Sequence, residues 1–216
     1  MWLEKHDGPG GKGLKGFESR LKRTKYILLR NELNQFLSLC THRDSKILDL
    51  GCGPGYMARF IELKNPNITK YLGLDISDVA TKFARDFFKN STFFSFRTFD
   101  LNNLDQLQDL LDEYNIILAI DILEHLSEDV AYNILHLIAQ KSDYVLINAP
   151  TSDSALLMAP EHIFGLSLSK PCNLFSEKFA GNRPWEIIKS QVVKWNESGD
   201  EILFVAKKGS KTMRNF

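Results

Sequence analysis

A short apolar run followed by three alternating glycines restricts the fold of this chain more than any other feature. Residues 46–50 are Lys-Ile-Leu-Asp-Leu, and glycine then recurs at Gly51, Gly53 and Gly55 before a helical stretch begins. An apolar run bounded by glycines is typical of a buried parallel strand. Glycine lets a ligand approach the backbone closely, and the N-terminus of the following helix favours an anionic group. The sequence therefore predicts a strand–loop–helix ligand site.

The alternation of strand and helix continues along the chain. Further strands are expected at 71–75, 93–99, 116–120 and 144–147. Helices are expected at 19–39 (one or two), 56–64, 77–89, 104–114 and 127–140. Serines at the start of the third and fifth helices suit N-caps. This alternation predicts a parallel sheet with right-handed crossovers and helices on both faces. Two final strand-like runs, 185–195 and 201–207, flank a polar turn and predict a hairpin.

Length and composition suit one soluble globular domain. The chain has 216 residues, of which 44% are hydrophobic and 25% charged, and its formal net charge is zero. We expect a flexible Gly/Lys-rich segment over 1–18, since 7–16 hold five glycines. A domain should follow over 19–209, with an acceptor-side insertion at about 150–182, and a basic tail over 210–216.

Charge and cysteine content limit the compartment and partners. Residues 1–30 carry eight basic and three acidic side chains, which suits either an arm that grips an acidic substrate or a solvated lead-in. The three cysteines include no Cys-x-x-Cys pair, and no signal peptide or membrane-spanning run is evident. We expect a cytoplasmic protein without membrane insertion; the oligomeric state stays open.

Aspartates at successive strand ends define the expected ligand. A dinucleotide loop needs glycine where this chain has Tyr56, and Asp49 would repel a pyrophosphate but suits a ligand with a cationic amine. Asp75 ends the next strand, where a carboxylate can accept hydrogen bonds from both hydroxyls of a ribose. Asp100 and Asp121 end the two strands after that, at the edge where doubly wound sheets bind ligands.

Three segments resemble the class I S-adenosylmethionine-dependent methyltransferases of the small-molecule type. They are residues 47–55, 71–77 and 121–126, and the resemblance covers about 44–150 closely. It implies an α/β, doubly wound, seven-stranded and mostly parallel sheet of order 3-2-1-4-5-7-6, with strand 7 antiparallel. It also implies S-adenosyl-L-methionine as cofactor and S-adenosyl-L-homocysteine as product.

The resemblance assigns roles to nine matching positions. The cofactor would contact Asp49, Gly51, Cys52 and Gly53 at its methionine end, Asp75 at the ribose, Ile76, Asp100 and Leu101 at the adenine, and Asp121 beside the sulfonium. In the family, the methionine carboxylate is often bound from the N-terminal helix. Candidates here are Lys22, Arg23, Lys25 and Tyr26.

Glu124, His125 and His162 are the candidate catalytic residues. With Asp121 they could instead hold a divalent metal, as in the RNA 3′-terminal 2′-O-methyltransferases, if one helical turn presents them on a single face. That match is incomplete, and Glu-His after the fourth strand is common among metal-free relatives, so we expect no metal. His162 could equally be a surface histidine without a role.

The predicted activity is methyl transfer to an O or N acceptor on a small or conjugated metabolite. An RNA or nucleotide acceptor, steered by the basic N-terminal arm, is an alternative within the class. A non-catalytic cofactor-binding partner subunit is an alternative from another class. A nicotinamide-dependent oxidoreductase is disfavoured by Tyr56, by Asp49 and by the terminal hairpin.

Overall fold

Seven strands form one sheet in the order β3-β2-β1-β4-β5-β7-β6, in which β7 is antiparallel to both of its neighbours. The structure is a computed structural model that describes residues 13–41, 44–61, 66–151, 165–167, 169–175, 184–194 and 200–209. The strands are β1 (Ser45–Leu50), β2 (Ile68–Asp75), β3 (Phe94–Thr98), β4 (Ile116–Ile120), β5 (Tyr144–Pro150), β6 (Trp185–Val193) and β7 (Glu201–Lys208). The predicted strand order and the antiparallel seventh strand are confirmed.

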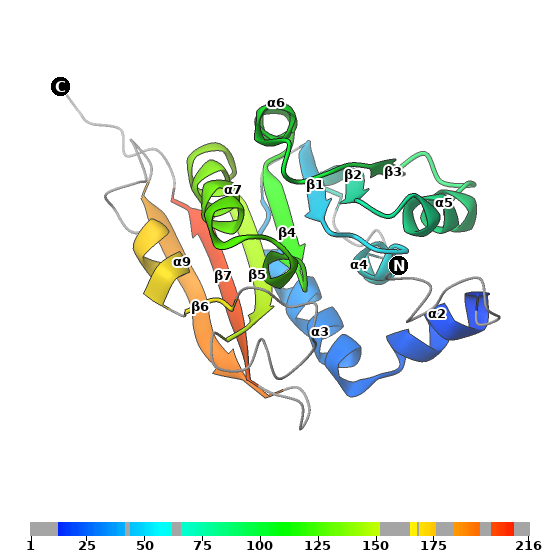
Figure 1. The fold of residues 1–216 in the computed structure, drawn as a ribbon, viewed down its shortest axis with the longest axis horizontal. Coiled ribbons are helices and arrows are strands. Elements are labelled where there is room, and N and C mark those ends of the chain that lie inside the picture. The colour runs from blue at the N-terminus through cyan, green and yellow to red at the C-terminus, as the bar shows by residue number, and fades with distance from the viewer. Residues whose placement is uncertain are drawn as a thin grey trace. The chain divides into compact units, whose positions relative to one another are not determined.

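The chain packs as two compact units, residues 1–101 and 102–216. The first unit contains β1–β3, with helices α2 (Gly13–Leu21), α3 (Thr24–Ser38), α4 (Tyr56–Phe60) and α5 (Asp78–Phe87). Its strands pair in parallel, so Asp49 lies opposite Gly73 and Gly73 lies opposite Phe96. In Figure 1, α4 lies between β1 and α2. The short helix after the first strand therefore separates the sheet from the N-terminal helix.

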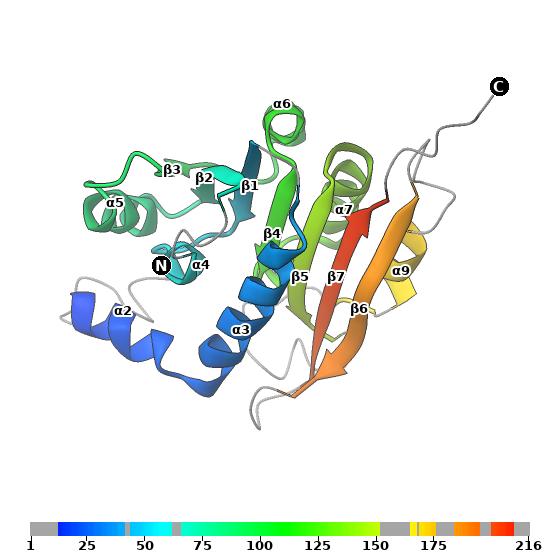
Figure 2. The same ribbon diagram turned by 180° about the vertical axis from the view of Figure 1, so that it is seen from behind.

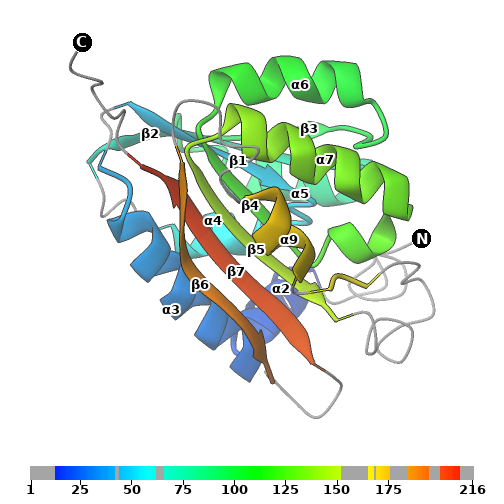
Figure 3. The ribbon, with the colours of Figure 1, turned by 90° about the vertical axis from the view of Figure 1, so that its left-hand side faces the viewer.

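The second unit contains the remaining four strands, of which β6 and β7 form the hairpin. Its helices are α6 (Leu104–Glu113), the 3₁₀ turn η1 (Leu123–His125), α7 (Glu128–Lys141) and α9 (Ser169–Leu174). Figure 2 shows β7 and β6 side by side along their length. Figure 3 shows α7 and α9 over one face of β5, β7 and β6. Among the described residues, no helix is long and apolar enough to cross a membrane.

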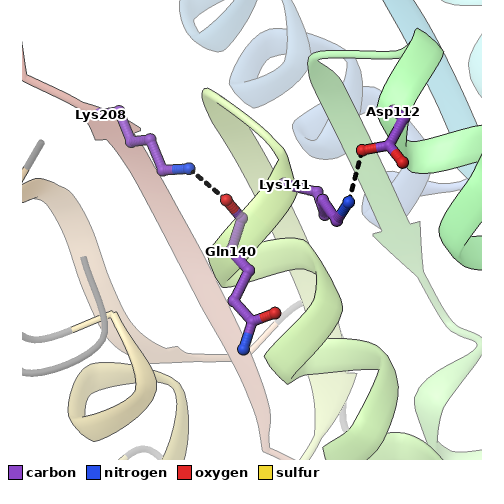
Figure 4. Close-up of polar contacts among 4 residues, drawn as sticks. All are labelled: Asp112, Gln140, Lys141 and Lys208. Carbon is purple, nitrogen blue, oxygen red and sulfur yellow. Dashed lines mark hydrogen bonds and ion pairs between the residues drawn. The ribbon is translucent and has the colours of Figure 1, made fainter. Parts of the chain in front are cut away.

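Polar contacts fasten α7 to its neighbours in the second unit. The indole of Trp185 on β6 donates to the carbonyl of Ala139 at 3.0 Å, and Lys208 on β7 donates to the carbonyl of Gln140 at 2.8 Å (Figure 4). Lys141 forms an ion pair of 2.6 Å with Asp112 on α6, also drawn in Figure 4. The two hairpin contacts satisfy carbonyls at the C-terminus of α7, where cations are also favoured by the helix dipole.

Several element boundaries differ from the sequence predictions. A helix begins at Gly13, inside the segment expected to be flexible, and the apolar stretch expected to hold one or two helices is divided between α2 and α3. Strand β2 begins three residues earlier than predicted and β5 extends to Pro150. Ser77 caps α5 as predicted by accepting from the amide of Ala80 at 3.2 Å. Ser127 stands at the start of α7 but makes no side-chain capping bond.

We expect Trp185→Ala to lower the free energy of unfolding by about 3 kcal/mol, because it removes a buried ring that packs edge-on against Phe175 and leaves the Ala139 carbonyl without its donor. Chemical denaturation measures the change. Val192→Ala, on the same strand at a side chain that is 47% exposed, is the control and should change stability by no more than about 0.5 kcal/mol. Equal effects of the two substitutions would contradict the fastening role.

Candidate cofactor site

The loop between β1 and α4 turns through three glycines in the left-handed region. Their φ angles are 70° at Gly51, 53° at Gly53 and 90° at Gly55, values that residues other than glycine rarely adopt. The Cys52 amide donates to the carbonyl of Leu74 on β2 at 2.9 Å, and the Gly55 amide donates to the Cys52 carbonyl at 3.0 Å. The glycines thus allow a tight loop that is fixed to the end of the neighbouring strand.

Asp75 connects this loop to the start of α5. One carboxylate oxygen accepts from the Gly53 amide at 2.8 Å, and the other accepts from the Ser77 amide at 2.8 Å. Burial raises the pKa of Asp75, and the two amides counter that rise. A carboxylate has about four lone-pair sites, so both oxygens keep capacity for ribose hydroxyls. The helix-start role and the predicted ribose role are therefore compatible.

Asp49 is a carboxyl group in the interior of the first unit. Its side chain is 1% exposed, and the phenol of Tyr71 on β2 donates a hydrogen bond to it. Burial raises the pKa of Asp49 to about 7, the Tyr71 hydrogen bond lowers it, and the charge of Asp75 raises it further. No basic side chain of the described residues forms an ion pair with Asp49. This site consequently fits a ligand that brings its own cation, as the ammonium of an S-adenosylmethionine would.

Cys52 and Gly73 pack the floor of the loop. A Cβ on Gly73 would lie 2.7 Å from the Sγ of Cys52 and 2.8 Å from the ring of Phe96. Cys52 is buried, and burial with the nearby Asp49 and Asp75 raises the pKa of its thiol, so the thiol stays protonated. The Cys52 side chain packs as a small apolar group beneath the loop, and its backbone is part of the loop itself.

The predicted adenine residues differ in exposure. Ile76 is 70% exposed directly after Asp75, an apolar side chain in solvent that suits a flat ring. Asp100 is also exposed, and the Phe99 amide beside it donates to the Asp75 carbonyl at 2.9 Å, which brings the end of β3 next to the end of β2. The side chain of Leu101, by contrast, is 5% exposed and belongs to the core.

The sequence prediction missed Arg20 on α2. Lys22 and Arg23 are exposed, whereas Arg20 is 8% exposed and its guanidinium lies 3.4 Å from the hydroxyl of Tyr56, the residue after the glycine loop. Phe17 stacks on the same Tyr56 ring with centroids 5.1 Å apart. The one available signal was the spacing of Phe17 and Arg20, which places both on one helix face beside each other.

The remaining predicted residues belong to the second unit. Asp121 has a φ of 53° and its amide donates to the carbonyl of Asn148 at 2.9 Å. The helical turn expected to present Asp121, Glu124 and His125 on one face is only the turn η1, which begins after Asp121. Glu124 is buried, and His125 is half-buried. The described residues contain no cluster suited to a metal ion, and His162 lies outside them, as does most of the segment 150–182.

The order of the sheet and the glycine loop with two aspartates define a class I, S-adenosylmethionine-dependent methyltransferase fold. The family described as methyltransferase domain matches residues 21–182, and the chain belongs to this family. S-adenosylmethionine is its methyl donor, as the motifs predict. A search of curated proteins finds no match.

Solved structures share the fold at low sequence identity. The magnesium protoporphyrin IX methyltransferase from Synechocystis, solved with bound S-adenosylhomocysteine, aligns with a TM-score of 0.66 and 14% identity over 96% of this chain and 92% of its own. The N-methyltransferase NodS from Bradyrhizobium japonicum, also solved with that product, gives 0.63 and 12% over 92% and 100%. A Haloferax volcanii putative methyltransferase, in complex with the Trm112 activator, gives 0.65 and 14% over 91% and 93%.

We expect Gly73→Ala to destabilise the protein by about 1–3 kcal/mol, because its Cβ would overlap Cys52 and Phe96, neither of which can move freely in the core. Thermal or chemical unfolding checks this. Ser95→Ala, an exposed position on β3, is the control. An unchanged stability of the Gly73 variant would show that the loop floor is less tightly packed than described.

Asp49→Asn should make the ligand-free protein more stable at neutral and higher pH. Between about pH 4 and the folded pKa of about 7, the folded state keeps a proton on Asp49 that the unfolded chain has lost, so wild-type stability falls as pH rises. The amide cannot ionise, so its advantage should grow over this window to about 1–4 kcal/mol and then level off. Denaturation curves at several pH values measure it. A pH-independent difference would contradict the assignment.

Proposed function

We propose that this chain transfers the methyl group of S-adenosylmethionine to an O or N acceptor on a small or conjugated metabolite. The observation that carries the cofactor half of the proposal is the glycine loop held to Asp75 beside the buried Asp49. It combines a close backbone approach, an acceptor for two hydroxyls and a negative site for an amine. These are the three polar features by which a nucleoside that carries an amino acid can be held.

Each residue of the first unit then has a separate task. Asp49 faces the ammonium, Gly51, Cys52 and Gly53 supply backbone along the methionine end, and Asp75 accepts from the ribose. Ile76 packs on the adenine, while Asp100 and the backbone of Leu101 lie at its edge. For Leu101 this limits the assignment to main-chain atoms, since its side chain is buried in the core.

Arg20 is the residue we propose for the methionine carboxylate. It is a guanidinium largely removed from solvent next to Tyr56, and a planar guanidinium binds a carboxylate through two parallel hydrogen bonds. Of the four residues that the sequence suggested for this contact, Lys22 and Arg23 are exposed, and Lys25 and Tyr26 are half-buried on α3.

The sulfonium methyl supplies an electrophile that is already activated, so the task of the chain is alignment and exclusion of water. Asp121, at the end of β4, is proposed to lie beside the sulfonium. His125 is half-buried and His162 follows in the acceptor-side segment; either could take a proton from a hydroxyl acceptor. Glu124 is 2% exposed and is better suited to orient its surroundings than to contact substrate.

The acceptor class is proposed from the charge of the chain and from its structural neighbours. Two relatives with the same fold are named for a porphyrin and for N-methylation, and the net charge of this chain is zero, which does not favour a polyanion. Another protein of this fold was solved in complex with an activator, so an enzyme that needs a partner is the alternative to test. Radiolabelled methyl transfer to pooled metabolites and to total RNA, with and without cell extract, separates these alternatives.

Asp75→Asn should weaken binding of S-adenosylhomocysteine about tenfold to a hundredfold, because an amide nitrogen cannot accept from a ribose hydroxyl or from the Gly53 amide. Isothermal titration calorimetry gives the affinity, and S-adenosylmethionine and NAD are titrated alongside. The control is Asp78→Asn, an exposed carboxylate three residues further on, which should change affinity less than about twofold. Binding of NAD without either methyl-cycle ligand would overturn the proposal.

A further inference from the structure

We infer that Tyr71 is a positioning residue for the cofactor: the hydrogen bond from its phenol holds the Asp49 carboxylate in place for the ammonium of the ligand. This inference rests on the proposed function, since it assigns a residue that acts through Asp49. Tyr71 itself is completely buried, so its proposed effect on the ligand passes through Asp49.

Packing explains why this phenol reaches Asp49. Tyr71 is paired with Ile47 across the parallel ladder, and Asp49 lies two residues further along β1 on the same face. Gly73, directly opposite Asp49, has no side chain to stand between the two groups. The ring is held by Phe94 and Phe96 of β3, with centroids 5.4 Å and 5.7 Å away. The Tyr71 side chain is therefore held in one rotamer with its hydroxyl directed at Asp49, and no rotamer change is needed when ligand binds.

The hydroxyl is not required to fill space. A phenylalanine would occupy the same aromatic cluster, yet position 71 carries a polar group at zero exposure, where a donor without a partner is costly. The donor meets Asp49, and no other hydrogen bond to this carboxyl is formed by the described residues. The pair is thus a polar contact maintained inside an aromatic core, at the point where the ligand loop begins.

The charges around Asp49 give the contact its functional consequence. Among the described residues, the titratable groups that face it are Tyr71 and Asp75 on β2 and Cys52 in the loop, and none of them is a cation. Burial opposes ionisation of Asp49, and the Tyr71 hydrogen bond favours it. Only the ionised form attracts an ammonium, so the phenol sets the pH above which the site is ready for its ligand.

The test is the pH profile of S-adenosylhomocysteine binding, measured by calorimetry on the full chain. Relative to wild type, Tyr71→Phe should bind about tenfold more weakly near pH 6 and less than about twofold more weakly near pH 9, because losing the donor moves ionisation of Asp49 upward by about one pH unit. The comparison is made at each pH separately, so titration of the ligand amine cancels. Tyr114→Phe, which removes another buried hydroxyl, should leave the profile unchanged.

Asp49→Asn completes the experiment as a thermodynamic cycle. In this background the added Tyr71→Phe change should have no further pH-dependent effect, because no carboxyl remains to titrate. A uniform loss at every pH, a profile that superimposes on wild type, or an equal shift in Tyr114→Phe would overturn the role of Tyr71 while leaving the proposed function intact. Absence of binding by wild type at every pH would overturn both.

Discussion

In the described part of the chain, a buried carboxylate without a neighbouring cation is the constraint on which the first unit depends. Asp49 lies in the sheet one residue before the end of β1, and burial alone disfavours its charge. Among the described residues, one hydrogen-bond donor, the Tyr71 phenol, contacts this carboxylate. The glycines of the loop leave room for a ligand to approach. Such a carboxylate lowers the stability of the protein relative to an apolar residue at the same position, which is a common property of ligand sites.

The second constraint is steric and belongs to the same loop. Gly73 on β2 leaves the space that Cys52 and Phe96 fill, and Asp75, two residues later, accepts from the loop amide of Gly53. One strand therefore both supports the loop from below and fixes it from the side. Residues of β2 that look like ordinary strand positions are part of the site for this reason.

The sequence predicted the sheet well because each strand is a short apolar run that ends in a turn residue. It singled out Asp49, Asp75 and the glycines because together they follow successive strands at one edge of the sheet, which is the pattern of a ligand site. It failed at Gly13, where tertiary packing of Phe17 against Tyr56 outweighs poor helix propensity, and it missed Arg20, whose burial depends on the same packing. The partnership of Tyr71 and Asp49 could not be predicted, since it depends on the register between two strands.

The attachment of Asp75 to Gly53 has one more consequence, for turnover. Because this bond joins two groups of the chain itself, it holds the loop without any contact to a ligand, which reduces the ordering required on entry. Every contact proposed for the first unit addresses the ribose, the adenine or the amino-acid end, and these parts are identical in donor and spent product. By these proposed contacts the unit would bind donor and product with similar affinity, and preference for the donor would arise where the sulfonium lies. Rapid cycling of such an enzyme would depend on removal of the product by a subsequent reaction.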